Sequence, residues 1–338
     1  MTQTRTTRRG RTPIVFVATA TLLVASAALS LAIGARALSL ADIWNGLTGS
    51  DPVASAVIWQ MRFPRTLLGI LVGAALGAAG VLAQAVTRNP LADPGLLGIS
   101  SGAAVSIVAG SAFLGIGGGA GRMALAVVGA ALATLVVFAF ASRSPEGLSP
   151  VSMTLAGMAI TACLGAVVSA IVLLDAESMD QYRFWQVGSL GLPDPQLLAI
   201  GAGVALAGAV LAIAISGSLG ALALGDDTAS ALGVKVGRTR VLAGLAVVLL
   251  SGMAVSLAGP IGFIGLIIPH AARAIVGNDV RRTLALSALL GPLLLTVADI
   301  IGRVVVRPAE LQVGVVTAVI GTPVFIWLTR RMRTKKGS

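Results

Sequence analysis

The sequence has little charge and few cysteine, histidine or aromatic residues, and these shortages narrow the class of protein. Only 11% of its 338 residues are charged, whereas 56% are hydrophobic and the mean hydropathy is +0.96. Apolar runs of about 20 residues recur from end to end, each long enough to cross a hydrocarbon core of about 30 Å. Alternating strands of about ten residues, which a transmembrane barrel requires, are missing. The composition predicts an all-α polytopic membrane protein.

Groups that carry chemistry are equally scarce. The single histidine, His270, follows Pro269 in an interrupted apolar run, where we interpret it as a structural or hydrogen-bonding residue. No GxxxxGK[ST] sequence occurs, so the chain cannot form a P-loop of its own. The lone cysteine, Cys163, lies in an apolar run and cannot form an internal disulfide. We therefore expect a chain that is not an enzyme, with no catalytic residues, no metal site and no bound cofactor.

Carboxylates are almost absent from the apolar runs. Asp299 is the exception, and Arg303 lies four residues later on the same helix face, so we expect the two to neutralise each other near the outer surface. Proton- or sodium-coupled transporters usually need carboxylates near the bilayer midplane. A transporter with this composition must draw its energy from elsewhere, or the chain is a passive channel.

Hydropathy predicts ten transmembrane helices. Their expected positions are residues 14–33, 66–86, 97–115, 122–141, 152–174, 196–216, 239–258, 260–277, 283–305 and 312–330. The first run is long for a secretory or twin-arginine signal, so we interpret it as an uncleaved helix. Both chain ends are basic, which places both termini in the cytoplasm and requires an even number of spans. With ten spans, 17 of the 24 Lys and Arg residues fall on the inner side.

The chain is expected to form one membrane domain between two basic tails. We predict a cytoplasmic tail over 1–13, a transmembrane domain over 14–332 and a second tail over 333–338. The net charge of +11 follows from the tails and inner connectors, so it does not indicate nucleic acid as a partner. The segment 217–238 is too polar to cross the membrane. Within it, Asp226 and Asp227 are expected to start a short helix, because anions stabilise the positive end of the helix dipole.

The second span has small residues on one face and a polar turn after it. Gly69, Gly73 and Gly77 recur at every fourth position, which predicts close packing against another helix. The turn that follows, RNPLADPGLLG (88–98), interrupts apolar sequence on both sides with two prolines that fix the backbone angle φ. On the predicted topology this turn lies at the cytoplasmic end of the bundle.

Four blocks of sequence resemble one family of transport proteins. They are RFPRTLLGILVGAALGAAGVLAQAVTRNPLADPGLLGISSGAA (62–104), LGALALGDDTASALGV (219–234), LAGPIGFIGLIIPHAAR (257–273) and AELQVGVVTAVIGTPVFIWL (309–328). In order and spacing they are similar to the FecCD-type permease subunits of ABC importers for iron–siderophores, haem and vitamin B12. The resemblance covers roughly residues 14 to 332, and its first block is the most specific.

The resemblance implies a type II importer. In that family two permeases, identical or paralogous, form a pathway at their interface. Two cytoplasmic ATP-binding subunits hold ATP and Mg, and an extracytoplasmic binding protein delivers the ligand. The chain is then expected in the cytoplasmic membrane of a prokaryote, with a ferric siderophore as cargo and lipid around it. Haem or vitamin B12 is the alternative within the family, and a secondary transporter or channel is the alternative from another class.

The resemblance also implies three groups of site residues, each with a local alternative. Outer arginines of the family meet the binding protein, which points to Arg62, Arg65 and Arg303, with Arg307 added by proximity; headgroup anchoring or internal pairing is the alternative. The cytoplasmic gate is expected at Asn89, Leu91, Ser149 and Pro150, where an ordinary capped turn is the alternative. Contact with the ATPase is expected at Leu224, Gly225, Asp226, Asp227, Ala231, Leu232 and Gly233, where a solvated loop is the alternative.

Overall fold

The computed structural model describes residues 12–34, 38–116, 119–144, 149–174, 179, 182–183 and 185–334. Most of the two predicted tails, 1–13 and 333–338, lies outside the described residues. Within the described part of the chain every regular element is a helix, which agrees with the all-α prediction.

Among the described residues, seven helices are long and apolar enough to cross a membrane. They are α1 (Thr12–Ala32), the continuous helix formed by α3 (Pro52–Ala56), η1 (Val57–Arg62) and α4 (Phe63–Thr87), and then α6 (Gly119–Ser142), α7 (Pro150–Leu174), α9 (Pro195–Leu222), α11 (Val236–Ala258) and α13 (Val280–Val305). Three shorter apolar stretches are α5 (Ile99–Leu114), α12 (Ile264–Val276) and the part Val313–Trp327 of α14 (Val313–Thr334). These ten helices coincide, within a few residues at most ends, with the ten predicted segments.

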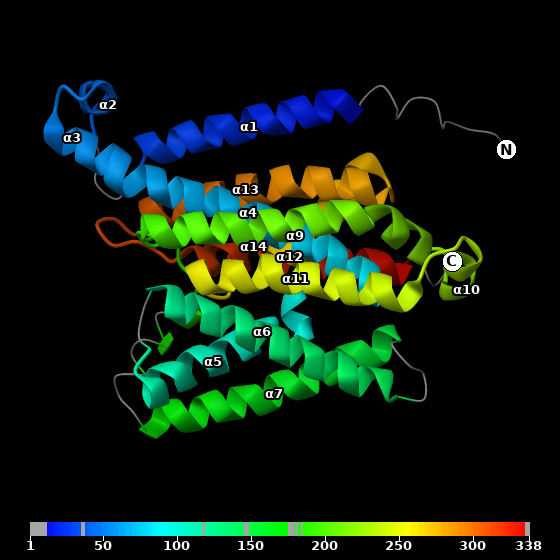
Figure 1. The fold of residues 1–338 in the computed structure, drawn as a ribbon. Coiled ribbons are helices and arrows are strands. Elements are labelled where there is room, and N and C mark those ends of the chain that lie inside the picture. Colours follow the sequence, from blue (N-terminus) through cyan, green and yellow to red (C-terminus); the bar gives the residue numbers. More distant parts are fainter. Residues whose placement is uncertain are drawn as a thin grey trace.

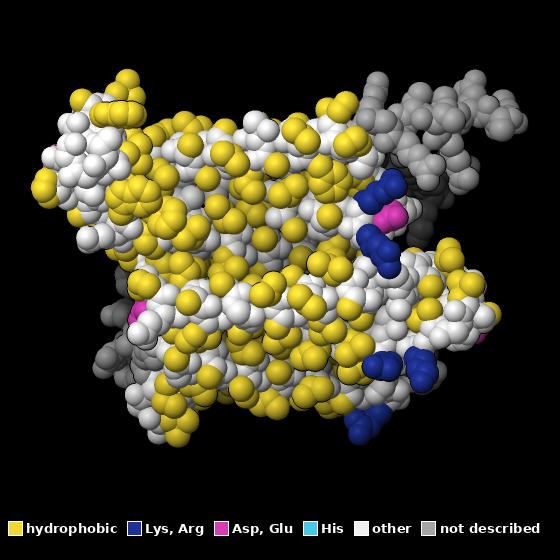
Figure 2. Space-filling view, turned by 45° about the horizontal axis from the view of Figure 1, so that its top comes forward, with side chains coloured by type: hydrophobic (Ala, Val, Ile, Leu, Met, Phe, Trp, Pro, Cys, Tyr) yellow, Lys and Arg dark blue, Asp and Glu magenta, His cyan; other side chains and the backbone are white. Residues whose placement is uncertain are grey.

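The long helices lie side by side, and the short helices α2 and α10 lie at the two ends of the bundle (Figure 1). Helix α1 begins, and α14 ends, at the end that carries the short helix α10 (Asp226–Ala231); we call it the α10 end. The opposite end carries α2 (Leu40–Thr48) and is called the α2 end. In Figure 2 hydrophobic side chains cover the flank of the bundle, whereas Lys and Arg side chains gather at the α10 end.

Helix α4 runs through the centre of the bundle, and its glycines bring it into backbone contact with two neighbours. A Cβ atom added to Gly73 would lie 2.6 Å from Cα of Pro292 in α13, and one added to Gly77 would lie 2.5 Å from the Ser287 carbonyl oxygen. One added to Gly80 would lie 2.0 Å from the carbonyl oxygen of Gly265 in α12. The predicted close packing of this face is therefore confirmed, and it extends one turn beyond Gly77.

Helix α12 is short and contains Pro269 in its interior. Proline has no N–H, so the carbonyl of Gly265, four residues earlier, loses its helical partner. The side-chain amide of Gln84 on α4 takes its place and donates to the carbonyls of Gly265 and Leu266 at 3.2 and 3.3 Å. A neighbouring helix thus satisfies the backbone group that the proline leaves without a partner.

The sequence analysis did not predict the helices between α1 and α4, and it predicted a polar loop that is longer than the observed one. Ser39 and Asp42 form a capping box for α2, and Asp51 with Pro52 starts α3. These are ordinary helix-start signals that hydropathy alone does not register. The polar loop predicted at 217–238 is confined to 223–235, because α9 continues to Leu222 and α11 begins at Val236.

We expect Gly80→Ala to destabilise the bundle, because its methyl group would overlap the Gly265 carbonyl on a backbone that cannot move aside. Overpacking of this kind costs about 1–3 kcal/mol. Gly203→Ala on α9 is the matched control, since a Cβ there meets nothing within 4 Å. Thermal unfolding in detergent should show a lower midpoint for Gly80→Ala alone. Equal midpoints for both variants would contradict the packing argument.

Candidate functional site

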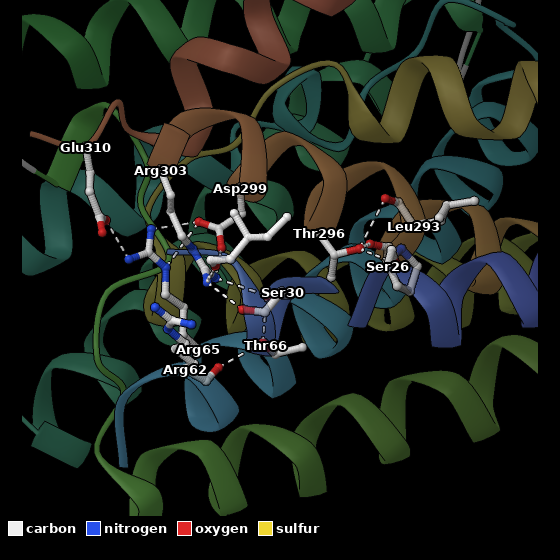
Figure 3. A network of polar contacts seen from close by, with 12 residues as sticks. Ser26, Ser30, Arg62, Arg65, Thr66, Leu293, Thr296, Asp299, Arg303 and Glu310 are labelled. Carbon is white, nitrogen blue, oxygen red and sulfur yellow. Dashed lines mark hydrogen bonds and ion pairs between the residues drawn. The ribbon is translucent and has the colours of Figure 1, made fainter. Parts of the chain in front are cut away.

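At the α2 end, arginines from two helices converge on the buried carboxylate of Asp299 (Figure 3). Arg303 forms an ion pair with it from the next turn of α13, as the sequence analysis predicted. Arg65 at the start of α4 donates to the same carboxylate through Nε at 3.1 Å and NH2 at 2.7 Å. One buried anion therefore holds two cations and links α4 to α13.

Arginines also cap the end of α1. The last carbonyls of a helix lack partners within the helix and form the negative end of its dipole, so cations stabilise them. Three arginines donate to carbonyls at this end. Arg303 donates to Ser30 at 3.0 Å, and Arg307 donates to Gly34 at 2.8 Å. Arg62 donates to both Leu31 and Ala32, at 2.8 and 2.7 Å. The cluster thus has a structural role, because it fixes the end of α1 against α4 and α13.

Burial divides the four arginines that were predicted to meet a binding protein. Arg62 and Arg303 are 5% and 2% exposed, so internal pairing, the alternative interpretation, describes them. Arg65 keeps 19% of its side chain exposed and forms a second ion pair, at 2.6 Å, with Glu310 on the surface. Arg307 is exposed. The surface available to a partner here therefore contains Arg65, Arg307 and Glu310, and the sequence analysis had not singled out Glu310.

At the α10 end, the turn over 88–98 is fastened to the segment 223–235. Arg88 adopts a left-handed backbone conformation with φ of 48°. Its Nε donates to the carbonyl of Leu222 at 3.1 Å, and its guanidinium pairs with Asp226 at the start of α10. Arg240 on α11 forms a second ion pair with Asp226 at 3.0 Å. Because 138 residues separate Arg88 from Asp226, no local sequence pattern could have joined them.

The turn is also braced internally. The side-chain oxygen of Asn89 accepts a hydrogen bond from the Leu91 amide at 2.9 Å, and Leu91 is half-buried. Asp93 caps the 3₁₀ helix η2 (Pro94–Leu97) by accepting from the Gly95 amide at 2.9 Å. Burial raises the pKa of Asp93, and the hydrogen bond from Gly95 opposes part of that rise.

Helix η2 packs against α7, the helix that begins at the other predicted gate region. Ser149 accepts a hydrogen bond from the Ser152 amide at 3.1 Å, the arrangement of a capped helix start. Pro150 is the first residue of α7, and its side chain lies outside the described part, as do residues 145–148. Asn89 and Ser149 thus both have local capping roles, and a gating role stays a proposal.

The segment 223–235 presents apolar side chains at the end of the molecule. Helix α10 begins at Asp226, as predicted, and it is flanked by Gly225 and Gly233 with φ of 115° and 79°. Leu224 and Leu232 are 65% and 63% exposed, and Ala231 and Asp227 are exposed as well. Isolated exposed leucines are common, so a role for these two as a partner contact stays a proposal.

A cavity of about 370 Å³ lies between the turn and the start of α13. Its polar lining residues are Gln84, Arg88, Arg273, Asn278 and Thr283. Arg273 on α12 donates to the side-chain oxygen of Gln84, the residue whose amide satisfies the carbonyls of α12. Gln84 therefore connects the polar lining of the cavity to the backbone of α12 at the position where Pro269 interrupts its hydrogen bonds.

Apolar helices around a buried α4, with polar and charged clusters at both ends, are typical of a polytopic membrane protein. The profile of the FecCD transport family matches residues 22–331, and the chain belongs to this family. Its relatives are the permease subunits of importers, which places the protein among membrane permeases.

Curated relatives match over nearly their whole length. The ferric enterobactin transport system permease protein FepD of Escherichia coli (strain K12) is 46% identical over 94% of this chain and 95% of the relative. The hemin transport system permease protein HmuU of Yersinia pestis is 37% identical over 93% and 95%. A solved inward-facing structure of a metal-chelate type ABC transporter superposes with a TM-score of 0.84 at 31% identity, covering 94% of this chain and 99% of the other.

We expect Asp299→Asn to lower the stability of the chain strongly, because it leaves Arg65 and Arg303 without their shared anion. Removing one partner of a buried ion pair costs about 3–5 kcal/mol. Glu310→Gln is the control, since it breaks an exposed pair worth about 0–1 kcal/mol. Unfolding in detergent at increasing SDS measures both variants. A similarly small loss of stability in both variants would show that burial of Asp299 does not determine its contribution.

Proposed function

We propose that this chain is the transmembrane subunit of an ATP-driven importer for ferric siderophores. The observation that carries the proposal is the match to FepD over 94% of the chain, since that relative is named for transport of ferric enterobactin. Relatives named for siderophore and ferric citrate transport in Bacillus subtilis (strain 168), 40% and 37% identical, support the same cargo class. The hemin permease is also similar at 37%, so haem is the second candidate cargo.

The α10 end is assigned to the cytoplasm of a prokaryotic cell, and all ten apolar helices are assigned as spans of one domain over 14–332. Lys and Arg gather at this end, as the positive-inside rule requires of cytoplasmic segments (Figure 2). The α2 end then faces outward. This orientation places the segment 223–235 where an ATP-binding subunit can reach it, and ATP and Mg would be held by that partner.

We assign the segment 223–235 as the contact with the ATPase. Exposed Leu224 and Leu232 supply apolar surface, while Asp226 joins α10 to Arg88 in the turn over 88–98. A displacement of α10 would therefore pull on this turn directly. The pair is exposed enough to break and re-form at small cost, because surface ion pairs contribute about 0–1 kcal/mol.

The turn over 88–98 and the start of α7 are assigned as the cytoplasmic gate, in a pathway shared with a second permease, identical or paralogous. Leu91 is half-buried in the single chain and can supply an apolar seal against a partner. The bracing of the turn by Asn89, together with the contact between η2 and α7, supports concerted movement of Asn89, Leu91, Ser149 and Pro150.

Reconstituted transport tests the function and the ATPase contact together. The chain should be purified with its ATPase and binding protein, placed in liposomes containing ATP, and supplied with ⁵⁵Fe-labelled enterobactin or haem. Leu232→Lys should reduce recovery of the ATPase at least about tenfold, because a charge would enter an apolar contact without a partner. Ser142→Lys, at an exposed position that ends α6 outside the segment 223–235, is the control.

Uptake of the ferric siderophore that requires ATP and the binding protein is the expected result. ATP-dependent uptake of haem alone would replace the cargo assignment, and uptake without any ATPase would favour a secondary transporter or channel. Full recovery of the ATPase with Leu232→Lys would remove the contact assignment and leave the cargo assignment intact.

We assign Arg65 and Arg307 as the docking residues for the binding protein. Arginine binds a carboxylate through two parallel hydrogen bonds, and Glu310 already occupies one side of Arg65. An incoming carboxylate would therefore have to displace Glu310. Removing Glu310 should therefore change the rate of docking if Arg65 binds the partner, and should leave that rate unchanged if Arg65 has only a structural role.

We expect Arg65→Glu to slow association of the binding protein and Glu310→Gln to accelerate it, by about threefold or more at low salt. Stopped-flow fluorescence or surface plasmon resonance across a salt series gives the association rates. Arg143→Glu, at the opposite end of the bundle, is the control for net charge. Equal rates for the wild type and both variants at every salt concentration would exclude docking at Arg65.

A further inference from the structure

The short helix α2 has an apolar face that no other part of the described chain covers. Leu40, Trp44 and Leu47 are 87%, 68% and 43% exposed. They follow one another at intervals of four and three residues, so they form a single stripe along the helix. The face toward the rest of the chain is marked by Gly46, which packs on Ala54 and Ile58 with no room for a Cβ.

The stripe belongs to a well-formed helix. Ser39 and Asp42 cap its start reciprocally, and Gly49 ends it in a left-handed conformation with φ of 79°. Contact with α3 holds it at a fixed place against the long helix that continues into α4. The exposed side chains are therefore presented in a defined direction.

The position of α2 matches the boundary of a membrane. The continuous helix from Pro52 to Thr87 has 36 residues, or about 54 Å at 1.5 Å per residue, so it extends well beyond a hydrocarbon core of about 30 Å. Arg62 binds the last carbonyls of α1 and so marks the level at which that lipid-exposed helix ends. Ile58, which packs on α2, lies four residues, or about 6 Å along the helix, beyond Arg62.

Figure 1 places α2 at the outer end of the bundle, just beyond the end of α1. Helix α1 is apolar and is itself exposed over most of its surface, so the helix that ends next to α2 offers a face to lipid. Trp59 and Phe63, with ring centroids 5.3 Å apart, are also exposed near the level of Arg62. Tryptophan is typical of the membrane–water interface.

We propose that α2 lies in the headgroup region of the outer leaflet, with Leu40, Trp44 and Leu47 inserted among the upper acyl chains. Residues 38–61 contain two aspartates and no Lys or Arg, so anionic lipid does not attract this segment electrostatically. Insertion is therefore driven by apolar burial and should be as complete in zwitterionic vesicles as in anionic ones. The position of α2 at a membrane surface requires only that the chain spans the membrane, whereas the choice of the outer leaflet rests on the orientation proposed above; neither depends on the cargo.

Fluorescence quenching by brominated lipid tests the proposal directly. The chain has four tryptophans, so replacing Trp59, Trp185 and Trp327 with Phe leaves Trp44 as the only emitter. In phosphatidylcholine vesicles, bromine at carbons 6 and 7 should quench Trp44 by about half and more than bromine at carbons 11 and 12, since interfacial helices insert about 5–10 Å. Half phosphatidylglycerol should leave this result unchanged.

The matched control moves the tryptophan about 100° around the helix, in a Trp44→Phe, Asn45→Trp variant. Its emission should be quenched at most half as strongly. As a second measurement, a nitroxide at Leu47→Cys in a Cys163→Ala background should be more accessible to oxygen than to a soluble nickel complex. This measurement keeps all four tryptophans.

Quenching of Trp44 by aqueous iodide but not by brominated lipid, with preferential nickel access at position 47, would overturn the proposal. Protection that develops only when the binding protein is added would overturn it as well, because α2 would then be a protein-docking helix.

Discussion

Close approach between α4 and its neighbours is the constraint on which the rest of the structure depends. In lipid, packing cannot gain from removing apolar surface from water, so helix contacts require short distances and internal hydrogen bonds. Gly73, Gly77 and Gly80 provide the distance, and Gln84 provides hydrogen bonds to the carbonyls that Pro269 leaves unpaired. A larger residue at any of these glycines would separate α4 from α12 or α13 and move the charged residues at both ends of α4.

Those charged residues use the same device at each end, a carboxylate shared by two arginines, but in different surroundings. Asp299 is 2% exposed and holds Arg65 and Arg303, so losing it leaves buried cations without a partner. The side chain of Asp226 is 42% exposed and holds Arg88 and Arg240, where water can replace either partner at little cost. The buried cluster around Asp299 is suited to holding two helices in fixed positions, whereas the exposed cluster around Asp226 can separate and re-form.

Hydropathy and charge were sufficient to predict the all-helical class, the positions of the long helices and the Asp299–Arg303 pair, because these depend on neighbouring residues. The joining of Arg88 to Asp226 and of Arg65 to Asp299 could not be predicted, since each depends on distant segments meeting in three dimensions. The burial of Arg62 was also missed, because an arginine before an apolar run gives no sign that it turns inward to cap another helix.

The attachment of α1 has a consequence for how the chain assembles. Besides the arginine caps, its buried residues are polar: Thr19, Ser26 and Ser30. Ser26 bonds to Thr296 and Ser30 receives Arg303, across separations of 270 and 273 residues. Synthesis runs from the N-terminus, so α1 enters the bilayer long before α13 exists. Arg62 and Thr66 can hold its end once α4 is inserted, but the bonds of Ser26 and Ser30 to α13 form only later, so the packing of the first helix is completed late in assembly.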